Sequence, residues 1–232
     1  MAGRARQLVL DLATRPALGR ADFFVSPSNR LALAQLDTWP GWPEGRLAVT
    51  GPAGSGKTHL AHVWAAGSGA RILPAVDLPA LDIAALPGET ALAVEDADRL
   101  ATLEDDRRRA AEEALFHVAN RLAAAGGSLM VSGRSAPAQW DLTLPDLASR
   151  LGAAPVARLE PPDDALLAAV LVKLFTDRQL PVAPEVVSYL VSRMDRSFAA
   201  AERLVARLDA AGLERRRRIT RSLAAEVLHG RT

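Results

Sequence analysis

The sequence predicts an α/β protein in which helices flank a parallel sheet and an all-helical C-terminal lid follows. Short apolar runs are typical of strands, and they lie at residues 46–50, 71–74, 91–94, 128–132 and 156–159. Helical patterns alternate with these runs, as in parallel sheets. After Pro161 and Pro162, apolar residues recur only at helical spacing. We therefore expect an extended N-terminal arm at residues 1–20, an α/β core at 21–162 and a helical lid at 163–232.

The composition indicates a globular protein. Of the 232 residues, 49% are hydrophobic and 24% are charged, which is enough to bury a core and argues against disorder. The net charge is only +1, so any attraction to nucleic acid or to an anionic membrane must be local. Apolar runs are too short to span a bilayer, and no cleavable signal is evident, so we expect a cytoplasmic protein without a membrane partner. The absence of cysteine excludes disulfides and thiolate chemistry.

The helical segments are amphipathic. Residues 106–125 place Leu115, Val118, Ala119 and Leu122 on one face, and charged residues that include Glu112 lie off that face. In the lid we expect four helices, the last capped by Thr220. The run 215–218 contains four arginines, which could contact phosphate, but we interpret the run as a solvated loop between lid helices.

A phosphate-binding loop lies between the first strand and the helix that follows it. The sequence GPAGSGKT at 51–58 fits the pattern G-x-x-x-x-G-K-[ST] in the context that this pattern requires. Glycines let backbone N–H groups turn towards phosphate oxygens, Lys57 reaches the β- and γ-phosphates, and the Thr58 hydroxyl ligates Mg²⁺. The cofactors are therefore ATP or ADP with Mg²⁺. The expected nucleotide-binding residues are Gly51, Pro52, Ala53, Gly54, Ser55, Gly56, Lys57, Thr58 and His59.

An acidic pair follows the third strand. Glu95 and Asp96 come at the strand end where a P-loop protein places its second Mg²⁺ ligand. We assign Glu95 to the metal, together with Thr58, and Asp96 to catalysis; the alternative is a charged strand end in solvent. Related ATPases usually place Asp before Glu, so the reversed order here predicts slow intrinsic hydrolysis.

Several separated segments resemble the AAA+ family of the bacterial replication initiator DnaA and its short paralogue Hda. FFVSPSNRLA at 23–32 resembles the motif on the nucleotide side of that family, and GKTHL at 56–60 resembles its P-loop. LPDLASRL at 144–151 resembles its arginine-finger box, and LEPPDD follows at 159–164. The resemblance covers nearly the whole chain.

The resemblance implies roles for three residues outside the P-loop. Arg150 would be an arginine finger that acts on the nucleotide of a neighbouring subunit, although a surface arginine is the plain alternative. Ser132 would be the first sensor, with Gly133 and Arg134 in place of the usual acidic continuation. Arg196 would be the second sensor, a lid arginine that reaches the γ-phosphate, unless it is an exposed lid charge.

The N-terminal arm resembles a sliding-clamp-binding peptide. In QLVLDL, the residues Leu8, Leu10 and Leu12 fit an apolar groove, and Gln7 fits a polar pocket. The same leucines could instead form a first strand or pack on the core.

The leading functional hypothesis is a negative regulator of replication initiation that, bound to the sliding clamp, promotes hydrolysis of DnaA-bound ATP through Arg150. Partners would be the clamp and DnaA, with a homodimer possible and no sequence-specific DNA binding. Two rivals remain: a nucleotide-bound adaptor that recruits replication proteins without stimulating hydrolysis, and an autonomous ATPase that resembles a helicase loader. A metal site at His59 and His62 is disfavoured, because no third ligand is evident.

Overall fold

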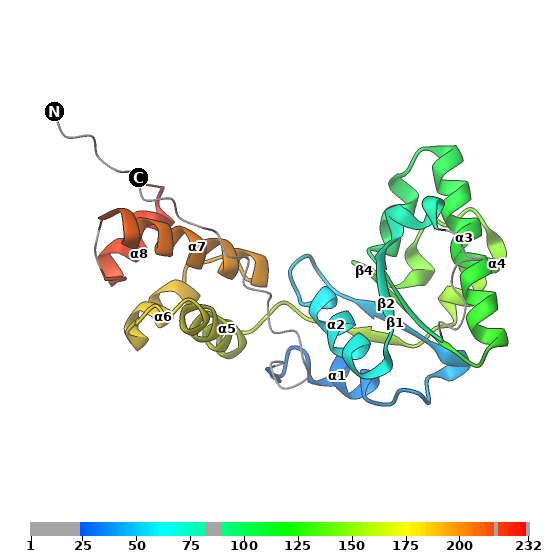
Figure 1. Cartoon of the computed structure of the whole chain (residues 1–232), viewed down its shortest axis with the longest axis horizontal. Helices are drawn as coiled ribbons and strands as arrows, with labels where there is room; N and C mark the ends of the chain where they lie inside the picture. The colour runs from blue at the N-terminus through cyan, green and yellow to red at the C-terminus, as the bar shows by residue number, and fades with distance from the viewer. Residues whose placement is uncertain (1–23, 82–89, 216–217, 231–232) are drawn as a thin grey trace.

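A five-stranded parallel sheet forms the centre of the computed structural model, which describes residues 24–81, 90–215 and 218–230 (Figure 1). The strand order is β2-β3-β4-β1-β5, and every neighbouring pair is parallel. All five predicted strands are present. Their bounds are β1 Arg46–Thr50, β2 Arg71–Pro74, β3 Ala91–Glu95, β4 Ser128–Gly133 and β5 Val156–Arg158.

Helices cover both faces of this sheet (Figure 1). The helices α1 (Arg30–Leu36) and α2 (Lys57–Ser68) pack on one face, and α3 (Asp105–Ala124) and α4 (Pro145–Gly152) pack on the other. Four short 3₁₀ turns complete the described part of the core. They are η2 Pro43–Gly45, η3 Ala75–Ala80, η5 Ala97–Thr102 and η6 Pro137–Gln139.

The two-residue period of a strand explains how one sheet makes two cores. In β1, Leu47 and Val49 pack with α1 and α2, whereas Ala48 faces the α3 side. In β4, Met130 joins the first core, and its neighbour Val131 joins the second. Because both faces are covered, the strands are nearly continuous apolar runs, as expected of a parallel sheet.

The lid is an all-helical bundle with its own core. Its helices are α5 (Asp164–Asp177), α6 (Pro184–Val191), α7 (Phe198–Arg215) and α8 (Arg221–Leu228). Asp163 caps α5 by accepting a hydrogen bond of 2.8 Å from the Leu166 N–H, and Thr220 caps α8 as predicted. Buried side chains that include Leu171, Leu190 and Val205 fill the interior of the lid.

The fold class predicted from the sequence is confirmed, and one local expectation differs. The helical pattern predicts that Glu112 lies off the apolar face of α3, yet its side chain is 1% exposed. A helix that packs on a sheet can bury a carboxylate where another element supplies donors, and the segment that starts α4 supplies them here. In the described part of the chain, no helix is long and apolar enough to cross a membrane.

Candidate nucleotide-binding site

The P-loop connects the carboxyl end of β1 to the first residue of α2, as predicted. Gly54 and Gly56 have φ values of +74° and +99°, which lie in the left-handed region that favours glycine. The lid also approaches both residues closely. A Cβ atom on Gly54 would lie 2.3 Å from the Ser197 Cβ, and one on Gly56 would lie 2.7 Å from the Phe198 ring. Glycine is therefore required at both positions by backbone conformation and by space.

Lys57 is folded back onto the loop. Its Nζ donates hydrogen bonds of 2.9 Å and 3.1 Å to the carbonyl oxygens of Gly51 and Pro52, and the residue is only 8% exposed. Burial lowers the pKa of Lys57, although the carboxylates of Asp96 and Asp98 oppose this effect. The ammonium group is thus held at the mouth of the loop by neutral carbonyls, which an anionic phosphate can replace.

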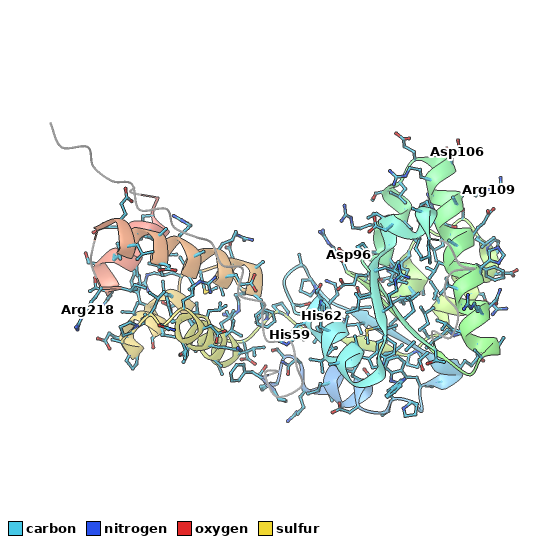
Figure 2. All side chains as sticks on the ribbon, viewed as in Figure 1. His59, His62, Asp96, Asp106, Arg109 and Arg218 are labelled. Carbon is cyan, nitrogen blue, oxygen red and sulfur yellow. The ribbon has the colours of Figure 1, made fainter. Side chains whose placement is uncertain are left out.

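The ends of β3 and β4 meet beside the P-loop. Asp96 has a φ of +52°, an uncommon value for a residue other than glycine, and its N–H donates a 3.1 Å hydrogen bond to the Ser132 Oγ. Two residues further along each chain segment, the Arg134 N–H donates a 2.9 Å hydrogen bond to the Asp98 Oδ2. The structure therefore brings together Ser132, Asp96 and the loop of Lys57, which the sequence assigned to one site. Figure 2 labels Asp96 at this edge of the sheet.

Buried polar atoms without partners lie at the same edge. Among the described residues, Ser55 Oγ, Glu95 Oε1 and Asp98 Oδ1 are buried and accept or donate no hydrogen bond. Such atoms are rare in folded proteins unless a ligand, an ion or water satisfies them. No group of three or more His, Asp or Glu side chains within the described ranges is arranged to hold a metal alone. A Mg²⁺ ion here would depend on phosphate oxygens in addition to the carboxylate of Glu95 and the exposed Thr58.

The lid contacts the P-loop through the start of α7. The Phe198 N–H donates a 3.2 Å hydrogen bond to the Gly54 carbonyl. Arg196, the proposed second sensor, donates a 3.2 Å hydrogen bond from Nε to the Pro162 carbonyl and pairs through Nη1 with Asp164 at 2.7 Å. Its guanidinium therefore lies at the junction of core and lid, and contact with a γ-phosphate stays a prediction.

Arg150 lies on the opposite side of the core from its own P-loop. It is in the last turn of α4, which leads to the amino end of β5. The pKa of Arg46, the first residue of β1, is lowered first by the burial of Arg46 and then by the nearby positive charge of Arg150. The P-loop follows the carboxyl end of the same strand, so the whole length of β1 separates the two features.

Arg150 is available to a partner. Its guanidinium carbon lies 5.3 Å from the centre of the Phe116 ring of α3, and the residue is half-buried. It makes no ion pair with any residue in the ranges that the structure describes. An arginine so placed can present its donors to another molecule and cannot serve the nucleotide of its own chain.

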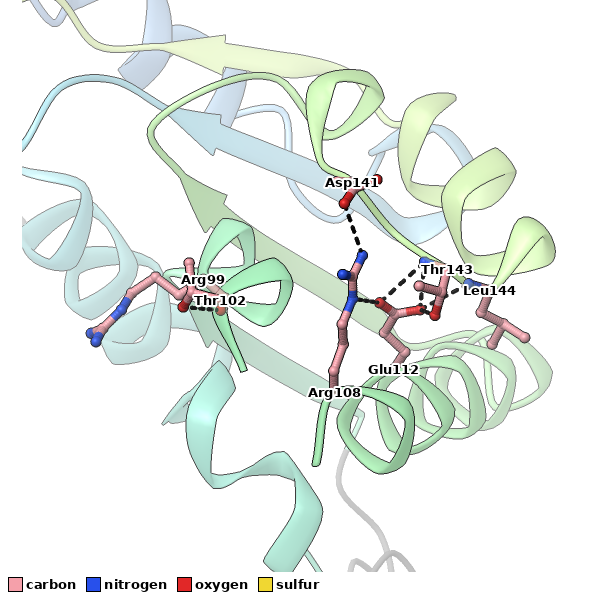
Figure 3. Close-up of polar contacts among 7 residues, drawn as sticks. All are labelled: Arg99, Thr102, Arg108, Glu112, Asp141, Thr143 and Leu144. Atoms are coloured by element: carbon pink, nitrogen blue, oxygen red, sulfur yellow. Dashed lines mark hydrogen bonds and ion pairs between the residues drawn. The ribbon is translucent and has the colours of Figure 1, made fainter. Parts of the chain in front are cut away.

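The start of α4 is fixed by Glu112, a residue that the sequence did not single out (Figure 3). The Glu112 carboxylate accepts hydrogen bonds from the Thr143 N–H and hydroxyl at 2.9 Å and 2.8 Å, and from the Leu144 N–H at 2.8 Å. Arg108 donates to the same carboxylate at 3.1 Å and lies 3.3 Å from Asp141. A buried acid is conspicuous only once α3 and α4 are seen together, so nothing in the local sequence indicates it.

The predicted clamp-binding residues Gln7, Leu8, Leu10 and Leu12 lie outside the described residues. They stay a prediction. His59 and His62 lie on α2, where Figure 2 labels them between the core and the lid.

Comparisons with known proteins agree with this architecture. Residues 164–228 match the family described as "Hda, lid domain". The structure of domain III of the replication initiation protein DnaA from Thermotoga maritima is similar over 93% of this chain and 97% of that chain, with a TM-score of 0.76 and 18% identity.

Two further structures are similar at lower coverage of their own chains. AMPPCP-bound DnaA from Aquifex aeolicus matches 86% of this chain and 67% of that chain, with a TM-score of 0.66 and 18% identity. A variant of the RuvB protein from Thermotoga maritima matches 88% of this chain and 68% of that chain, with a TM-score of 0.65 and 16% identity. The lid therefore matches an Hda family model, and the chain shares the fold of the AAA+ domain of DnaA.

Proposed function

We propose that this protein restrains replication by promoting hydrolysis of ATP bound to the DnaA initiator, with Arg150 acting as a finger in trans. The observation that carries the proposal is the location of Arg150, half-buried and without an ion-pair partner among the described residues, at the end of the sheet opposite its own P-loop. A guanidinium inserted at a neighbour's γ-phosphate stabilises the charge that spreads over the transferred phosphoryl oxygens. Support also comes from the Hda-type lid and the DnaA-like core.

The protein's own P-loop would bind ATP or ADP with Mg²⁺. The AMPPCP-bound DnaA structure supports nucleotide binding by analogy. The unpartnered Ser55 hydroxyl and Glu95 Oε1 lie at the edge of the sheet beside the P-loop, where they can bind a ligand or an ion. When bound, Mg²⁺ would neutralise phosphate charge. Lys57 would exchange its two loop carbonyls for phosphate oxygens, and Thr58 and Glu95 would hold the ion.

The N-terminal arm would attach the protein to the sliding clamp. The support is the sequence QLVLDL at 7–12, in which alternate leucines and one glutamine suit an apolar groove with a polar pocket. Attachment to a clamp on DNA raises the effective concentration of the finger near a DNA-bound initiator.

The deciding experiment follows hydrolysis of ATP preloaded on purified initiator, in the presence of clamp loaded on DNA. Arg150→Ala should lower the stimulated rate by about 10³-fold or more, because arginine fingers contribute factors of that size. Arg109→Ala is the matched control: Arg109 is an exposed arginine of the same core that pairs with Glu113 at 3.0 Å, and its loss should leave stimulation unchanged. Equal stimulation by wild type and Arg150→Ala would disprove the finger.

A second candidate is a nucleotide-bound adaptor that recruits the initiator without stimulating hydrolysis. The order Glu95–Asp96 favours it, since Asp96 is one methylene shorter than the usual glutamate and its backbone is bound to Ser132. A pull-down with clamp and initiator, with and without changes at Gln7 and Leu10, separates the two only when the rate of ATP hydrolysis is measured beside it. An adaptor would retain both proteins while the rate of ATP hydrolysis stayed at its unstimulated value. High turnover by the isolated protein would instead indicate an autonomous ATPase.

A further inference from the structure

The outer end of the lid carries a group of arginines that the proposed function does not use. Arg193 follows α6, Arg221 begins α8, and Arg218 lies three residues before Arg221; all three are exposed. We call Arg193, Arg218, Arg221 and the half-buried Tyr189 the lid-tip cluster. Figure 2 labels Arg218 at the end of the lid that faces away from the core.

Two of these arginines share one aromatic ring. The guanidinium carbons of Arg193 and Arg221 lie 4.2 Å and 5.0 Å from the centre of the Tyr189 ring. Contact with one ring holds the two like charges close together and restricts both side chains, so less side-chain entropy is lost when they bind an anion. The aromatic surface is already used by the arginines, which disfavours stacking on an unpaired base.

The part of the protein that the structure describes does not neutralise the cluster. Among the residues that the structure describes, Arg193, Arg218 and Arg221 form no ion pair with a carboxylate. Arg193 donates a hydrogen bond only to the neighbouring Ser192 hydroxyl, at 2.7 Å. The first turn of α8 contains no acidic residue that would balance Arg221.

The sequence places the excess positive charge in the lid. Residues 163–232 contain 12 Lys or Arg and 9 Asp or Glu, whereas residues 1–162 contain 16 and 18. The near-neutral total therefore hides a basic lid and an acidic remainder. A local field of this kind attracts polyanions to one end of the molecule and orients them there.

We propose that the lid-tip cluster binds the phosphate backbone of duplex DNA without reading its sequence. Arginine matches phosphate with paired donors, and a duplex presents one negative charge per about 1.7 Å of its axis, so several phosphates lie within reach of neighbouring guanidinium groups. The site is separate from the P-loop and from Arg150. Neither clamp nor initiator is needed for this contact, so it can be tested independently of the proposed function.

The experiment measures binding of the full chain to a short fluorescent duplex of arbitrary sequence by anisotropy, over a range of salt concentrations. The double variant Arg193→Gln/Arg221→Gln should bind about tenfold or more weakly at low salt. The slope of log K against log salt should fall by about 2, because each lost phosphate contact removes about 0.9 from it. Arg107→Gln/Arg203→Gln removes the same charge from exposed positions outside the cluster, and its slope should stay at the wild-type value.

Three outcomes would overturn the proposal. The first is an unchanged affinity and salt slope in the cluster variant, and the second is an equal loss in the control variant. The third is binding confined to a single strand of the same length. A cluster variant that binds duplex normally but no longer retains the initiator in a pull-down would identify the surface as a protein contact. Urea unfolding of both variants checks the fold: exposed cation–π contacts contribute little to stability, so the cluster variant should remain folded.

Discussion

Replacing Glu112 by glutamine tests how α4 is held in place. The buried Glu112 carboxylate accepts hydrogen bonds from the Thr143 N–H and hydroxyl, the Leu144 N–H and the Arg108 Nε. Glutamine keeps the shape of the side chain but replaces one acceptor oxygen by an NH₂ group. The NH₂ group and the Arg108 Nε–H are both donors, so the bond from Arg108 is lost. The bonds from Thr143 and Leu144 remain, but their acceptor is no longer charged.

The expected loss follows from the size of such bonds. A hydrogen bond to a charged group contributes about 1.5–3 kcal/mol, so Glu112→Gln should lower the free energy of unfolding at neutral pH by about 2–4 kcal/mol. Urea unfolding followed by circular dichroism measures this difference. The adjacent Glu113→Gln is the matched control, because Glu113 is half-exposed and pairs with Arg109 one turn along α3. Its loss should cost no more than about 0.5 kcal/mol.

The same variant has a pH signature. Burial alone would raise the pKa of Glu112, but the hydrogen bonds from Thr143, Leu144 and Arg108 outweigh burial and lower it. A lowered folded-state pKa stabilises the protein above the unfolded-state value of about 4.3, and this contribution is lost as pH falls through the folded-state pKa. The gap between wild type and Glu112→Gln should therefore be constant from pH 7 to 5 and shrink below about pH 4. A gap under about 0.5 kcal/mol at pH 7, or one that widens in acid, would refute this account.

The remaining predictions concern the P-loop. Lys57→Ala should weaken binding of ATP and Mg²⁺ by about 10- to 100-fold in calorimetry, because one or more charge-assisted bonds are lost. The control Lys173→Ala, on the lid, should leave the affinity unchanged. Equal affinities of the two variants would contradict the role of Lys57. Gly54→Ala and Gly69→Ala both place alanine at a φ near +70°, but only Gly54 faces the lid, at Ser197, while Gly69 faces open space. Gly69→Ala should cost about 1–2 kcal/mol of unfolding free energy, and Gly54→Ala should cost clearly more and expose the start of α7 to hydrogen exchange. Equal costs would mean that the lid contact contributes nothing.

The sequence predicted those parts of the site that depend on local patterns. The segment Gly51–Thr58 could be identified as a P-loop because it lies between a strand and a helix and has glycines where the backbone is left-handed. Ser132 was assigned to the site by the family resemblance and Asp96 by its position after a strand, and the 3.1 Å hydrogen bond between the two residues shows that they are neighbours. Strand bounds were predicted to within one residue because buried parallel strands are short apolar runs bounded by turns.

Other features depend on contacts between distant segments and have no local signature. Glu112 looks like a solvent-facing charge in the sequence of α3, and only the approach of Thr143, 31 residues away, makes it a buried acceptor. The contact of Phe198 with Gly54 joins the lid to a loop that precedes it by more than half the chain. The pairing of Arg196 with Asp164 arises in the same way, because it depends on how α7 is oriented towards the start of α5.

The separation of Arg150 from the P-loop along β1 makes the two proposed functions of this chain independent in principle. The proposed nucleotide site at Lys57 and the proposed finger Arg150 lie near opposite ends of β1, so neither can act directly on the other within a molecule. Lys57→Ala should therefore impair stimulation only if bound nucleotide orients the lid, through the Phe198–Gly54 contact, for docking on the initiator. If Lys57→Ala stimulates ATP hydrolysis by the initiator fully and Arg150→Ala does not stimulate it, the P-loop is dispensable for the trans reaction. Loss in both would mean that nucleotide binding and docking are coupled through the lid.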